Sequence, residues 1–143
     1  MKHERSKSPL VLMEQAIMIL VFSVAATLCI QAFVGADRTS REMYRRDRAA
    51  DCCQTMAETL KAMKGDYIVT AELLDGEFRD DRLIVSYDKD WQITEFATAE
   101  YILCVEEVTE GEYVTTAKVS VKEKNEGKEI FSLPVSWQEV AHE

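Results

Sequence analysis

An uncharged run of 19 residues at positions 16–34 constrains the fold of this chain more than any other feature of its sequence. The run belongs to a longer apolar segment, 10–34, in which Glu14 is the only charged residue. A helix of about 20 apolar residues crosses the hydrocarbon core of a bilayer, whereas the core helix of a soluble protein needs only one apolar face. We therefore predict a transmembrane helix at residues 10–34, preceded by a short basic stub at residues 1–9.

A cleaved signal peptide is the alternative interpretation of the same segment. Val34, Gly35 and Ala36 have the small-residue spacing of a signal-peptidase site and follow a basic N-terminal region. The apolar run is longer than the usual signal-peptide core of about 7–15 residues. We therefore favour a retained membrane helix over a small secreted domain that is cleaved after Ala36.

A second helical segment is predicted at residues 36–64. Positions 37–64 contain no Gly or Pro and are rich in Arg, Ala, Glu and Met, which favour helix. Seven-residue steps join Met43, Ala50 and Ala57, and also Cys53 and Leu60, into a narrow apolar seam. Gly65 is expected at the C′ position that ends this amphipathic helix. A seam of such small residues is better suited to packing on a sheet of the same chain than to an intermolecular zipper.

The rest of the chain, residues 66–143, has the two-residue period of β-strands. We predict strands at 83–87, 99–108, 113–123 and 129–140, joined by short turns, with Pro134 on an edge strand. Residues 75–81 are expected to form a turn or loop, and residues 67–74 form either a strand or a short helix. The predicted fold class is α+β: a long N-terminal helix, membrane-spanning and then amphipathic, packed on a small antiparallel β-meander.

Composition excludes several classes of function. The 26 acidic and 17 basic residues give a net charge of -9, which argues against a general nucleic-acid-binding protein. The only histidines, His3 and His142, are at opposite ends of the chain. No metal-ligand spacing, nucleotide motif or catalytic triad is visible. We therefore predict a non-enzymatic protein with no catalytic residues, no metal and no cofactor.

The four cysteines follow no CxxC spacing, so neither a zinc ribbon nor a thioredoxin motif is expected. A disulfide between Cys53 and Cys104 is a candidate if the domain lies outside the cell. Four free thiols are the favoured alternative.

Five arginines follow the apolar segment closely, and we predict that they contact anionic lipid or act as a topology signal. Acidic residues are interspersed among them, so pairing along one helix face is an alternative. The cluster comprises Arg38, Arg41, Arg45, Arg46 and Arg48.

The segment PLVLMEQAIMILVFSVAA at residues 9–26 resembles the N-terminus of type IV pilins and of the pseudopilins of type II secretion. In that family a leader peptidase cuts after a Gly, and a Glu is the fifth residue of the mature protein. Glu14 is the fifth residue counted from Leu10, so the resemblance implies a role for it in assembly between helices. Pro9 replaces the family's Gly and Leu10 its aromatic residue at this processing junction, and we therefore expect the leader to stay uncleaved.

The resemblance implies a single-pass structural or assembly protein of the cell membrane, with the lipid bilayer and other pilin-like subunits or membrane assembly proteins as partners. A stand-alone, membrane-anchored binding or regulatory module is the alternative. A literal count of basic residues near the helix favours a cytoplasmic C-terminal domain. The resemblance implies an extracytoplasmic domain, which is the orientation that we favour.

Overall fold

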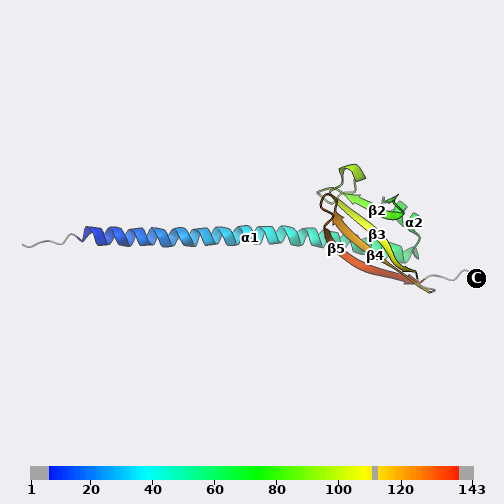
Figure 1. Cartoon of the computed structure of the whole chain (residues 1–143), viewed down its shortest axis with the longest axis horizontal. Helices are drawn as coiled ribbons and strands as arrows, with labels where there is room; N and C mark the ends of the chain where they lie inside the picture. The colour runs from blue at the N-terminus through cyan, green and yellow to red at the C-terminus, as the bar shows by residue number, and fades with distance from the viewer. Residues whose placement is uncertain (1–6, 111–112, 139–143) are drawn as a thin grey trace, which may run out of the picture. The chain divides into compact units, whose positions relative to one another are not determined.

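The computed structural model describes residues 7–110 and 113–138 of the chain, and it has the predicted α+β class (Figure 1). Helix α1 (Ser8–Ala62) is followed by helix α2 (Tyr67–Leu73), strands β1 (Glu77–Arg79) and β2 (Arg82–Tyr87), and the short 3-10 helix η1 (Phe96–Thr98). Strands β3 (Tyr101–Glu110), β4 (Val114–Glu123) and β5 (Glu129–Gln138) complete the chain. The chain divides into two compact units, Met1–Glu42 and Met43–Glu143, which are described separately below.

The sheet is a five-stranded antiparallel meander in the order β1-β2-β3-β4-β5. The four predicted strands are confirmed with small shifts of their ends. The prediction of a loop at residues 75–81 was wrong in part, because the three residues of β1 pair with β2 at one edge. The open choice at residues 67–74 is settled as helix α2, in which Asp66 caps the N-terminus by accepting hydrogen bonds from the backbone of Ile68 and Val69.

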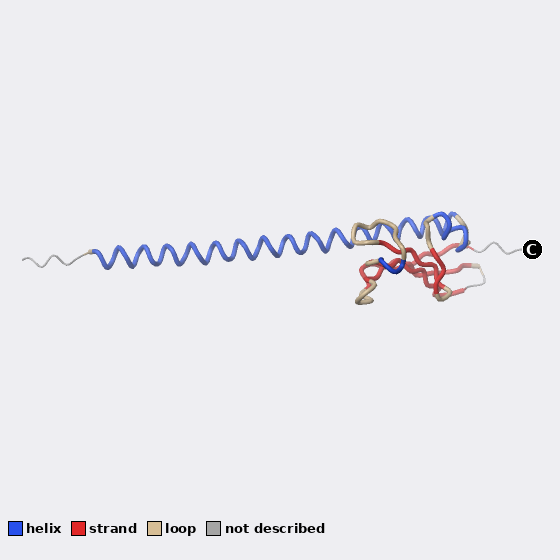
Figure 2. Tube along the Cα trace, turned by 90° about the horizontal axis from the view of Figure 1, so that it is seen from above, coloured by secondary structure: helices blue, strands red, loops and turns tan. Residues whose placement is uncertain are grey.

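The last part of α1 covers one face of this sheet, which we call the inner face (Figure 2). Its buried positions recur every three or four residues, as a helical face requires. They are Ala49, Cys53, Met56, Ala57 and Leu60. The predicted seven-residue seam is therefore wrong at its first two positions, since Met43 is exposed and Ala50 only half-buried. The helix follows a 3.6-residue period because its partner is a sheet and not a second helix.

The inner face of the sheet supplies the other half of the core. Alternate residues of β2, β3 and β4 point to this face, and the antiparallel register brings them side by side. The fully or nearly fully buried members are Leu83, Val85, Leu103, Val105, Ala117, Val119 and Val121, with Val135 and Trp137 from β5. The residues of opposite parity form the outer face, which α1 does not cover.

The end of α1 is a Schellman turn, shifted by one residue from the expected position. The N–H of Gly65 donates to the carbonyl of Leu60 (2.9 Å), and that of Lys64 donates to Lys61 (3.1 Å). Lys64 is thus the C′ residue with φ of 53°, and Gly65 follows it with φ of 81°. Two consecutive left-handed residues turn the chain sharply into α2.

Candidate functional site on the exposed helix and the outer sheet face

The first candidate site is the N-terminal unit, where α1 is exposed and apolar on all sides. Within the described residues this helix is the one element long and apolar enough to cross a membrane by length and composition. The predicted segments 10–34 and 36–64 are one continuous helix, because Gly35 stays helical and its carbonyl accepts a hydrogen bond from Thr39 Oγ1 (3.0 Å). Ser23 and Thr27 likewise donate to the carbonyls four residues earlier. Their hydroxyls therefore need no water, which suits an apolar surrounding.

Pro9, Leu10 and Glu14, the residues singled out in the resemblance motif, lie in the first two turns of α1. Pro9 is in the first turn, where its missing N–H breaks no helical hydrogen bond. Leu10 and Glu14 are exposed on the helix surface. Glu14 has no ion pair among the residues that the structure describes.

The five arginines do not act as one cluster. Arg41 pairs with Asp37 one turn earlier (3.0 Å). Arg45 bonds Glu123 at the end of β4 (2.8 Å), so it fastens α1 to the sheet and is not simply lipid-facing. Arg48 is half-buried, and its Nε has no hydrogen-bond partner in the described structure. Arg38 and Arg46 are exposed and have no ion pair in residues 7–110 or 113–138.

The structure does not bring the candidate disulfide partners Cys53 and Cys104 together, and all four cysteines are free in it. Cys53 is buried between α1 and the inner face, with Sγ 4.0 Å from the carbonyl oxygen of Val119. Cys104 belongs to the outer face of β3, where its Sγ lies 3.9 Å from Glu106 Oε1. The sheet separates the two thiols, since successive strand residues point to opposite faces.

The thiols of Cys52 and Cys53 lie near an aromatic cluster. This cluster is at the end of the sheet where Arg45 bonds Glu123. Trp91 stacks on Tyr101 with centroids 4.3 Å apart, and Tyr87 lies 6.1 Å from Trp91. Burial raises the pKa of the Cys53 thiol to about 12 and also raises the pKa of Cys52 and of Tyr87. These groups stay protonated at neutral pH, so they form a packed wall and not a reactive centre.

The second candidate site is on the outer face, where the segment between β2 and β3 folds back over the sheet. The backbone N–H of Thr94 donates to the carbonyl of Ser86, and Lys124 Nζ donates to the carbonyls of Phe96 (2.5 Å) and Ala97 (2.8 Å). These bonds hold the ring of Phe96 between two cations. Arg79 Cζ lies 3.9 Å from the ring centroid and Lys124 Nζ 4.8 Å from it.

Two hollows flank Phe96, and sequence reasoning found neither. The larger, about 610 Å³, lies between Phe96 and the β1–β2 edge. The smaller, about 260 Å³, lies toward β3 and β4. Phe96 stands half-buried on the outer face, apart from the buried core on the inner face. The acidic residues around 75–81 looked like a solvated loop, and only the tertiary fold brings them to Phe96.

Comparisons with protein families, with curated proteins and with solved structures found no match to this chain. The fold and the two candidate sites therefore carry the functional argument.

Proposed function

We propose that this protein is a single-pass, membrane-anchored, pilin-like assembly subunit whose α+β domain lies outside the cytoplasm. One observation carries the proposal: a single uninterrupted helix, α1, is apolar and exposed over its first part and forms half of a domain core over its last part. The same element therefore provides both the candidate membrane anchor and one layer of the domain core, as a membrane-anchored subunit requires.

Glu14 supports assembly over a solitary anchor. A carboxylate in an apolar helix costs about 2.5–3.5 kcal/mol at mid-bilayer, and less near the interface where Glu14 would lie. Residues of this kind usually face a partner or a polar path. A cationic or hydrogen-bonding group on a neighbouring helix would offset the cost, at about 0.6–2 kcal/mol for a polar pair. Other copies of this chain and related membrane proteins are the proposed partners, with lipid around the helices.

Oxidative crosslinking of the full chain in its native membranes tests the proposal. Cys29 is exposed on the apolar part of α1, so helices packed side by side should give a Cys29–Cys29 dimer. We expect Glu14→Gln to lower the dimer yield and Glu14→Leu to lower it further, within the range of about 3- to 30-fold that such a pair provides. Gln15→Leu is the matched control, because it removes a neighbouring polar group that carries no charge. Dimer yields that stay at the wild-type value in both Glu14 variants would favour a stand-alone anchored module.

A further inference from the structure

The larger hollow on the outer face has the chemistry of a receptor for a cationic side chain. Three carboxylates, those of Asp75, Glu77 and Glu95, line it together with the single cation Arg79. None of the three carboxylates forms an ion pair in the described residues. The hollow therefore carries a net charge of -2, which no cation of residues 7–110 or 113–138 neutralises through an ion pair.

A buried hydroxyl in the same hollow has no partner. Ser86 is 4% exposed and lines the hollow, and its Oγ has no hydrogen bond in the described structure. Leaving a buried polar group unpaired is unfavourable, because the group has lost its hydrogen bonds to water. A guest that donates a hydrogen bond to this oxygen would remove the cost. The unpaired hydroxyl thus indicates a ligand independently of the acidic residues.

The shape and lining of the hollow favour an organic cation over a metal ion. No group of three His, Cys, Asp or Glu side chains within the described residues converges closely enough to hold a metal. Ile84, Ile93 and Phe96 provide apolar surface between the carboxylates. An arginine side chain matches both the apolar surface and the carboxylates. Its methylene stem packs on apolar surface, and its guanidinium has five N–H donors and no acceptor.

The charge distribution of the chain identifies the source of this arginine. Residues 37–48 of α1 contain 5 basic and 3 acidic residues, a net charge of +2, whereas residues 49–143 contain 9 basic and 21 acidic residues, a net charge of -12. A second copy would therefore bring a basic helical segment to an acidic domain. Arg46 is the exposed arginine of the folded domain's helix without an ion pair in the described structure.

The hollow also lies at the same end of the folded domain as Arg46. Arg45 bonds Glu123 (2.8 Å), and the next residue, Lys124, bonds the carbonyls of Phe96 and Ala97 at the wall of the hollow. Arg46 and the hollow therefore lie at the same end of the folded domain, where the domain of a second copy can present its Arg46 to the hollow. We propose that the hollow receives Arg46 of a second copy, an inference that rests on the proposed assembly function.

Charge exchange between two differently tagged copies tests this contact in membranes that contain the full chain. One copy carries Ala97→Cys and the other Met43→Cys, both with Cys29→Ser, and a bis-maleimide joins neighbouring copies. Reversing the charge of the hollow with Glu77→Arg and Glu95→Arg should lower the heterodimer yield about five- to tenfold. Adding Arg46→Glu to the other copy should restore the yield to within about twofold.

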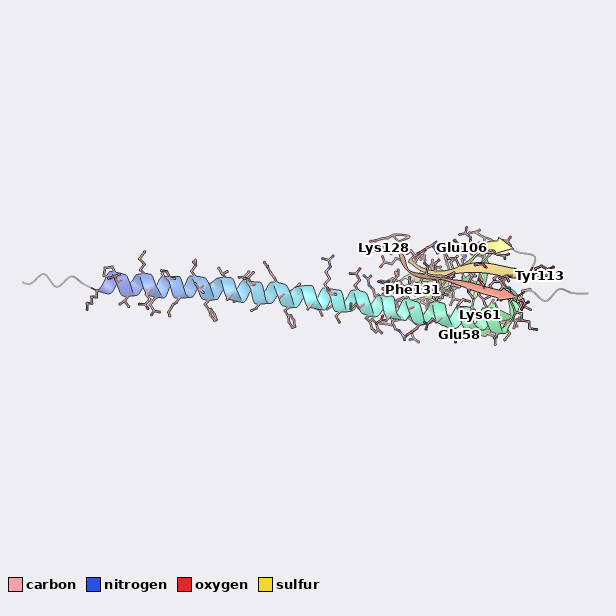
Figure 3. The ribbon with its side chains drawn as sticks, turned by 90° about the horizontal axis from the view of Figure 1, so that it is seen from below. Glu58, Lys61, Glu106, Tyr113, Lys128 and Phe131 are labelled. Carbon is pink, nitrogen blue, oxygen red and sulfur yellow. The ribbon has the colours of Figure 1, made fainter. Side chains whose placement is uncertain are left out.

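Three comparisons make the experiment decisive. Glu58→Arg is the matched control, since Glu58 is exposed on α1, which covers the opposite face of the sheet (Figure 3). An unchanged yield in the hollow variants, or a loss that Arg46→Glu fails to restore, would overturn the proposal. A second set of copies keeps Cys29 and tests assembly separately from the hollow. If the Cys29 dimer persists in the hollow variants, the assembly function still stands. If the wild type gives no Cys29 dimer, the assembly function is contradicted. Circular dichroism of each variant checks that the domain stays folded.

Discussion

Gly65 is packed directly against the indole of Trp137. A Cβ atom on Gly65 would lie 2.5 Å from Cε2 of that ring and closer still to Nε1, and the backbone φ of 81° disfavours any other residue. This contact connects the end of α1 to the last strand of the sheet. The turn therefore depends on the absence of a side chain at this one position.

We expect Gly65→Ala to lower the free energy of unfolding by about 2–4 kcal/mol, through overpacking and left-handed strain together. Gly127→Ala is the matched control: its φ is also positive, at 64°, but a Cβ there meets nothing within 4 Å. It should cost about 1 kcal/mol, from backbone strain alone. Urea unfolding of the detergent-solubilised chain measures both values, and equal losses would show that Trp137 can move aside.

The pH dependence of stability should report the buried thiol of Cys53. Burial raises its pKa from 9.0 to about 12, so the native state holds this proton more tightly than the unfolded chain. The stabilising contribution is complete below pH 9 and is lost as the pH rises toward 12. We expect unfolding free energy to fall across this window, and to fall less steeply in Cys53→Ala. Cys29→Ala, outside the domain core, is the control and should show the same fall of unfolding free energy with pH as the wild type. If Cys53→Ala also shows the wild-type fall, the effect belongs to tyrosines such as Tyr67, whose pKa is also raised.

The ion pair between Arg45 and Glu123 should stabilise the domain measurably. Its N–O distance is 2.8 Å, and the side chains are 41% and 19% exposed. A double-mutant cycle with Arg45→Met and Glu123→Gln should give a coupling of about 0.5–1 kcal/mol that weakens with salt. The pair Arg41–Asp37, 80% and 54% exposed, is the comparison, with an expected coupling of about 0–0.5 kcal/mol. Equal couplings would mean that Arg45 does not fasten the helix to the sheet.

Pro9 should prevent processing by a leader peptidase that expects Gly. The ring fixes φ near -65° and removes the backbone N–H, so such an enzyme should bind this junction poorly. N-terminal sequencing of the membrane-extracted protein should find Met1 or Lys2. Pro9→Gly, produced in cells that contain such a peptidase, should shift the start to Leu10. A wild-type start at Leu10 would contradict the prediction, and a start at Asp37 would establish signal-peptide cleavage.

The orientation of the domain can be read from a single introduced thiol. Asn125 is exposed in the turn between β4 and β5. Asn125→Cys should react with a membrane-impermeant maleimide in intact cells if the domain is extracytoplasmic. The parent chain is the control and gives the background from its own thiols: Cys53 and Cys104 are buried, Cys52 is half-buried, and Cys29 lies in the apolar segment. Labelling only after lysis would reverse the orientation and agree with the literal count of basic residues.

Local signals in the sequence were sufficient for most of the secondary structure. The uncharged run at 16–34 and the absence of breakers at 37–64 predicted helix, and alternation in β4 and β5 predicted strands, because one buried face imposes each period. The three-residue strand β1 was missed because its residues, Glu77 to Arg79, are all exposed and show no apolar alternation. Its pairing with β2 comes from the tight turn between them and not from burial.

The candidate sites divide in the same way. The long apolar helix, Glu14 and Pro9 are visible in the sequence because each depends only on nearby residues of one helix. The hollow is not, since Asp75, Ser86 and Glu95 come from three segments that meet only when the chain between β2 and β3 folds back over the outer face.

The sequence by itself determined that this chain has a long apolar helix and a small antiparallel sheet, because hydrophobic periodicity acts locally. Only the tertiary structure decided which face each residue occupies. It separates Cys53 from Cys104 across the sheet, pairs Arg45 with Glu123, and leaves Ser86 without a hydrogen-bond partner beside unpaired carboxylates. These outcomes depend on strand register and helix rotation, which are set by packing of the whole core and not by any single segment.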